Sequence, residues 1–152
     1  FKIAPELCIG WIPRTAKPAQ SINGSEVTMN KILSVLVLLP AVLFVVTGLR
    51  WLIDPAGIAP EFGLVLGEGL GLSSQVGDMS GFFLTLGICM LVALVSGRRA
   101  WYYPPALLLL LTAVGRVIAW LLHDAALASQ IGVEVVAAVI LLVASRRLAQ
   151  EA

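Results

Sequence analysis

The sequence predicts an all-α membrane protein, a bundle of four transmembrane helices with a Gly/Pro-rich interfacial loop between the first two. Four apolar stretches, at about 32–53, 76–96, 104–122 and 128–145, are each close to the ~20 residues that a helix needs to cross a membrane. Hydrophobic residues make up 59% of the chain and charged residues only 12%, against about 25% in soluble domains. We therefore expect one transmembrane domain at 29–148 and a short C-terminal tail at 149–152.

The first 28 residues are predicted to form an N-terminal extended tail, because three prolines and two lysines occur there without periodicity. An ordered tail would point to a larger assembly. Since the chain begins with Phe, its origin stays open among processing, truncation and a true start at Met29. The first apolar stretch is too long for a signal peptide and lacks a cleavage site, so we expect an uncleaved helix that Pro40 kinks.

The segment at 54–75 follows the first helix and holds five glycines and two prolines, which break a long helix. Two interpretations stay open. The segment can lie at the interface or tuck over the mouth of the bundle, or it can form a lid that shapes a binding pocket.

The distribution of Lys and Arg along the chain predicts how the helices are oriented across the membrane. The cations gather in three places, before the first helix, between the second and third, and after the fourth: Lys2, Arg14, Lys17 and Lys31; Arg98 and Arg99; Arg146 and Arg147. Because such an excess marks the cytoplasmic side, we expect both termini to be cytoplasmic. Trp51 and Trp120 are expected in an aromatic belt on the opposite side. Small residues within the helices are expected at helix contacts, namely Gly77, Gly81, Gly87 and Gly115.

Four ionisable residues near the non-cytoplasmic side are the candidate site. Arg116 and Glu134 lie at similar depths on helices joined by a short turn, so they should form an ion pair. Arg50 and Asp78 lie on that same side, closer to the helix ends. The sequence predicts one cluster of these four charges, which either fixes helix packing or lines a polar pocket for a ligand.

The rest of the chain offers few chemical groups. His123 is the only histidine, and it is either a solvated helix-end residue or a titrating or ligand residue. Cys8 and Cys89 are expected as free thiols. Without a Cys/His cluster we expect no metal site and no cofactor, and the net charge of +1 gives no reason to expect nucleic acid as a partner.

Four short segments of the chain resemble the sequence pattern of a known family. At Arg50–Pro55, Gln75–Asp78, Gly97–Trp101 and Val114–Val117 the chain resembles a bacterial membrane family catalogued as domain of unknown function 4345. The likeness covers about 29–148. It implies a small four-helix inner-membrane protein, and it places Asp54, Asp78, Arg116 and Glu134 in the family's pattern. The family implies no reaction.

Two functions compete on these grounds. The first is a non-catalytic accessory or structural subunit of a larger bacterial inner-membrane complex, of respiratory or photosynthetic type, with the lipid bilayer and other proteins as partners. The second is a small-molecule-binding membrane protein or enzyme that uses a charged pocket on the non-cytoplasmic side. A transporter is a weaker third, because the chain has no repeats.

Overall fold

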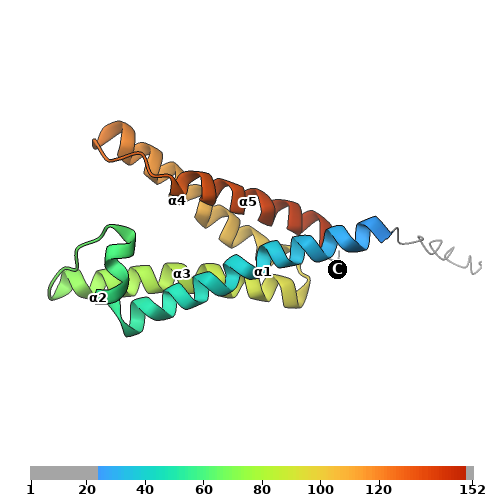
Figure 1. Ribbon diagram of the computed structural model, residues 1–152, viewed down its shortest axis with the longest axis horizontal. Coiled ribbons are helices and arrows are strands. Elements are labelled where there is room, and N and C mark those ends of the chain that lie inside the picture. The colour runs from blue at the N-terminus through green and yellow to red at the C-terminus, as the bar shows by residue number, and fades with distance from the viewer. Residues whose placement is uncertain (1–23, 150–152) are drawn as a thin grey trace, which may run out of the picture.

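The computed structural model describes residues 24–149, and these residues form helices and no strand (Figure 1). Four long helices are joined by shorter helical turns: α1 (Gly24–Ile53), α2 (Pro55–Ile58), the 3-10 turn η1 (Ala59–Phe62), α3 (Leu70–Ser96), the 3-10 turn η2 (Arg99–Tyr102), α4 (Tyr103–Leu122) and α5 (Gln130–Arg147). The tail predicted at 1–28 lies outside the described residues as far as residue 23, as do residues 150–152.

Two predicted boundaries are wrong. The first helix begins at Gly24 and not near 32, because residues 24–28 continue it: Glu26 suits the positive N-terminal end of the helix, and the Thr28 hydroxyl donates to the Gly24 carbonyl at 3.0 Å. The second long helix begins at Leu70 and not near 76, so Gly71 lies inside a helix.

Within residues 24–149, three helical segments are long and apolar enough to cross a membrane, namely Gly24–Ile53, Leu70–Ser96 and Arg99–Leu122. The last helix, α5, is 18 residues long and carries Glu134, Arg146 and Arg147. Large apolar side chains are exposed along all four long helices, for example Leu39 and Val136. A surface of that kind suits lipid contact and indicates a membrane protein.

The four long helices are arranged as two hairpins, α1 with α3 and α4 with α5 (Figure 1). Glycine brings α1 and α3 together. A Cβ atom on Gly87 would lie 2.7 Å from the carbonyl oxygen of Ala41, and one on Gly48 would lie 2.9 Å from the backbone nitrogen of Leu84. Only glycine allows so close an approach of two backbones. Gly87 is therefore at a helix contact, as predicted.

The two hairpins converge at one end of the molecule and diverge at the other (Figure 1). We call the end where α1 begins and α5 finishes the closed end. There a single core includes Val37, Met90, Tyr102 and Leu141, one residue from each of α1, α3, η2 and α5. We call the other end, with the turn from α4 to α5, the open end. Its core joins only α1, α2, η1 and α3.

The predicted Gly/Pro-rich loop is partly helical and packs on the first hairpin. Asp54 caps α2 by accepting a hydrogen bond from the Gly57 backbone N–H at 3.0 Å. Ile58 and Ala59 are buried beside Trp51. Gln75 of α3 holds the non-helical remainder, because its side chain accepts from the Gly67 N–H and donates to the Val65 carbonyl. The segment thus covers the open end of the first hairpin.

Three glycines do not lie where the sequence predicted. A Cβ atom on Gly77, Gly81 or Gly115 would meet nothing within 4 Å. Within the described residues these positions are therefore not helix contacts. The close contact between α1 and α3 is made through Gly48 and Gly87 instead.

Candidate functional site

An ion pair joins the helices of the second hairpin. Arg116 of α4 donates through Nε to Oε1 of Glu134 on α5 at 2.8 Å. The seven-residue turn at 123–129 makes these helices antiparallel neighbours, and each residue lies about one to two turns from it, so the two side chains meet at the same depth. The predicted Arg116–Glu134 pair is confirmed.

The pair leaves hydrogen-bonding capacity unused. Glu134 Oε2 is buried and has no hydrogen-bond partner among the described residues. The terminal nitrogens of Arg116 likewise form no hydrogen bond there, and its side chain is 37% exposed, against 12% for Glu134. Burying a carboxylate oxygen away from water without a hydrogen-bond donor costs free energy. The site therefore offers one acceptor and several donors to a third group.

A cavity of about 250 Å³ separates this pair from the first hairpin at the open end. Arg116, Gln130 and Glu134 provide its polar wall. The opposite wall is aromatic and comes from α1, η1 and α3, namely Phe44, Phe62, Phe82 and Phe83. These rings pack against one another, with centroids 5.3 Å apart for Phe62 and Phe83 and 5.1 Å apart for Phe82 and Phe83.

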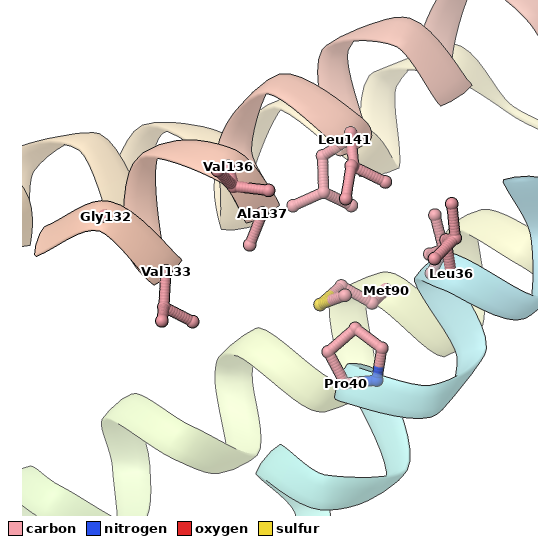
Figure 2. Close-up of a pocket in the computed structure, with 10 residues that line it drawn as sticks. Leu36, Pro40, Met90, Gly132, Val133, Val136, Ala137 and Leu141 are labelled. Atoms are coloured by element: carbon pink, nitrogen blue, oxygen red, sulfur yellow. The ribbon is translucent and has the colours of Figure 1, made fainter. Parts of the chain in front are cut away.

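A second cavity, of about 350 Å³, continues from the first towards the closed end. Val133 and Ala137 of α5 line both cavities. Figure 2 shows these two side chains directed into the gap between the hairpins, with Met90 of α3 and Pro40 of α1 on its other side. The residues that line this second cavity are all apolar. Together the two cavities form one groove along α5, polar at the open end and apolar inside, which we call the inter-hairpin groove.

The predicted cluster of four charges does not form. Arg50 pairs instead with Glu61 of η1, through two hydrogen bonds of 2.7 and 3.1 Å. Both side chains are exposed, and the guanidinium holds the pKa of Glu61 below its ordinary value. Asp78 is exposed and has no ion pair within residues 24–149. The prediction of one four-charge cluster is wrong because the hairpins diverge at the open end. This divergence separates α1 and α3 from Arg116 and Glu134.

Two other predicted residues lie away from the groove. His123 is exposed at the C-terminal end of α4 and is not one of the groove's lining residues. Within residues 24–149, no group of three or more His, Cys, Asp or Glu side chains could hold a metal ion. Cys89 is a free thiol on α3, and Cys8 lies outside the described residues.

Trp51 was predicted in an interfacial belt, and the structure corrects this. Its side chain is fully buried, with its ring centroid 6.0 Å from that of Phe62. The reason is the α2–η1 segment, which folds back over the end of α1. Trp120 is exposed, and its place in an interfacial belt stays a prediction.

Sequence reasoning missed the aromatic wall and Glu61. The four phenylalanines are visible in the sequence, but only their convergence from three elements makes them a wall. Glu61 follows Arg50 by eleven residues, and only the tight turns of α2 and η1 bring the two together. A carboxylate in a Gly/Pro-rich segment shortly after a helix-terminal arginine was the available signal.

Comparison with known proteins adds no relative, since no family model, curated protein or solved structure matches this chain. The resemblance to domain of unknown function 4345 stays a prediction.

Proposed function

We propose that this protein is a four-span protein of the bacterial inner membrane that binds an amphipathic small molecule in the inter-hairpin groove. The observation that carries the proposal is the groove itself, which lies between two apolar hairpins and has one ion pair with unused hydrogen-bonding groups. Ligand sites are typically apolar concavities with a few placed polar groups.

In this proposal α5 is the fourth spanning helix. Its length of 18 residues gives about 27 Å, close to the hydrocarbon thickness. The charge that would oppose insertion is Glu134, and Arg116 neutralises it. Arg146 and Arg147 lie in the last turn, where they can reach the headgroups. The count of cations then puts both termini in the cytoplasm and the open end on the other side.

Bound molecules test the proposal directly. The protein is extracted from bacterial membranes in polymer-bounded discs, and the small molecules in the discs are identified by mass spectrometry. We expect one class of amphiphile to be enriched over its share of the bulk membrane. Equal composition in discs and bulk membrane would contradict the proposal.

A matched pair of variants locates the binding. Val133→Trp fills the groove, because Val133 lines both cavities and is 69% exposed. Val139→Trp adds the same side chain to the same helix at an exposed position outside the two cavities. Enrichment should disappear in the first variant and persist in the second. If both variants keep it, the molecule binds elsewhere and the proposal fails.

The accessory-subunit function is a second candidate, and one observation favours it. Gly77 and Gly81 leave an open strip on α3 beside the exposed carboxylate of Asp78, and small residues let a neighbouring helix approach closely. Gly81→Leu should then abolish co-purification of a partner protein without lowering stability. A wild-type protein that purifies alone from mild detergent would exclude this function.

A further inference from the structure

Building on the proposed binding function, we infer that the amphiphile has a flat, hydroxylated ring as its head and one long apolar tail. An alkylated or prenylated hydroquinone is the chemical class. This class follows from three features of the inter-hairpin groove, which are the unused hydrogen-bonding groups, the aromatic wall and the course of the second cavity.

The unused groups define the head. Glu134 Oε2 needs a hydrogen-bond donor, and the terminal nitrogens of Arg116 need an acceptor. A hydroxyl group both donates and accepts, so one hydroxyl placed between the two residues satisfies both. The ion pair has no net charge, and a charged head would face a like charge at Arg116 or Glu134. A neutral head with a hydroxyl group therefore fits best.

The aromatic wall favours a ring over a glycerol head. Phe44, Phe62, Phe82 and Phe83 lie opposite the ion pair across the same cavity. Flat rings gain from offset or edge contacts with such a wall. A ring with a hydroxyl group on one side can touch the phenyl rings and reach Glu134 at once, because the two walls belong to one cavity of about 250 Å³.

The second cavity accommodates the tail. It begins at Val133 and Ala137 and ends among Leu36, Pro40 and Met90, all apolar. The tail then lies along α5 towards the closed end, while the head stays at the open end. The groove thus selects an orientation of the bound molecule as well as its chemical class.

A photoreactive probe tests class and orientation together. The probe is a decyl hydroquinone with a diazirine at the tail end, added under nitrogen to the full chain in phosphatidylcholine nanodiscs. We expect labelling around Leu36, Pro40 and Met90, reduced at least tenfold in Val133→Trp and unchanged in Val139→Trp. Labelling confined to outward-facing residues of α5 would overturn the inference.

Two comparisons isolate the hydroxyl group. The dimethyl ether of the probe keeps the ring and tail but cannot donate to Glu134, so wild-type protein should bind it about tenfold more weakly. Glu134→Gln keeps one oxygen to accept from Arg116 and puts an NH2 donor in the place of Oε2, so the hydroxyl loses its acceptor. This variant should bind the hydroquinone less tightly by a similar factor and should bind the ether no more weakly than wild type does. Equal binding of hydroquinone and ether by wild type would overturn the class.

The proposed function can survive that failure. If the discs still enrich an amphiphile and Val133→Trp still abolishes the enrichment, the groove binds a molecule of another class. If the enrichment is absent as well, both the inference and the proposed function fail. A decanol probe that labels the same residues as well as the hydroquinone does would exclude a role for the ring.

Discussion

Each end of the molecule has an apolar core, but the two ends pack differently. At the closed end one core contains a buried alanine from each of the four long helices, namely Ala41, Ala93, Ala106 and Ala138. At the open end the α2–η1 segment covers the first hairpin, and the second hairpin stands apart with its ion pair. Small buried side chains thus let the helices meet at the closed end, while an ion pair and large aromatic rings line a cavity at the open end.

The largest effect should come from the contact that unites the first hairpin. Gly87→Leu would place side-chain atoms against the backbone of α1, and overpacking of this kind costs about 3 kcal/mol or more when backbone must move. Unfolding in mixed micelles should show that loss. Gly81→Leu, six residues earlier in open space, is the matched control and should change stability by less than about 0.5 kcal/mol. Equal losses in the two variants would mean that the hairpin packs differently.

Removing one residue of the Arg116–Glu134 ion pair should have the second-largest effect on stability. Arg116→Leu leaves a mostly buried carboxylate without a partner, and we expect a loss of about 2 kcal/mol, below the full cost for a completely buried pair. The double variant Arg116→Leu with Glu134→Leu should recover most of that loss, because no charge is left unpaired. The same unfolding measurement checks both. A double variant less stable than either single one would show that the pair itself stabilises the fold.

A smaller effect is expected at the covering segment. Asp54→Ala removes the cap of α2, which costs about 1 kcal/mol. The loss should be local, so hydrogen exchange should rise at Ile58 and Ala59 while the closed end stays protected. Asp78→Ala, which alters an exposed carboxylate with no partner in residues 24–149, is the control and should leave exchange unchanged.

The smallest effect concerns pH. The folded-state pKa of Glu61 is lowered by the hydrogen bonds from Arg50, so this pair stabilises the fold above the unfolded-state pKa of Glu61 and loses its effect as pH falls through the folded-state value. Because both groups are exposed, the change should be slight. Thermal unfolding followed from neutral pH to pH 3 should show a slightly smaller drop for Glu61→Gln than for wild type. Identical curves would mean that the pair contributes nothing.

Sequence alone predicted the elements better than their arrangement. Apolar length located the four long helices, and matched depth on antiparallel neighbours predicted the Arg116–Glu134 pair. The sequence alone could not predict that Arg50 pairs with Glu61, because this pairing depends on the path of a short Gly/Pro-rich segment. The inter-hairpin groove was also out of reach, since it depends on how two hairpins diverge, and neither periodicity nor charge describes an angle between helices.

Distances between spin labels in lipid bilayers test most directly whether the hairpins part at one end only. With Cys8 and Cys89 replaced by serine, one label pair at Ile53 and Leu122 spans the open end, and a second pair at Met29 and Val143 spans the closed end, where both residues line one shallow cavity. We predict a clearly longer distance for the first pair than for the second. Equal short distances at both ends would show a bundle closed along its whole length, with no groove for a ligand.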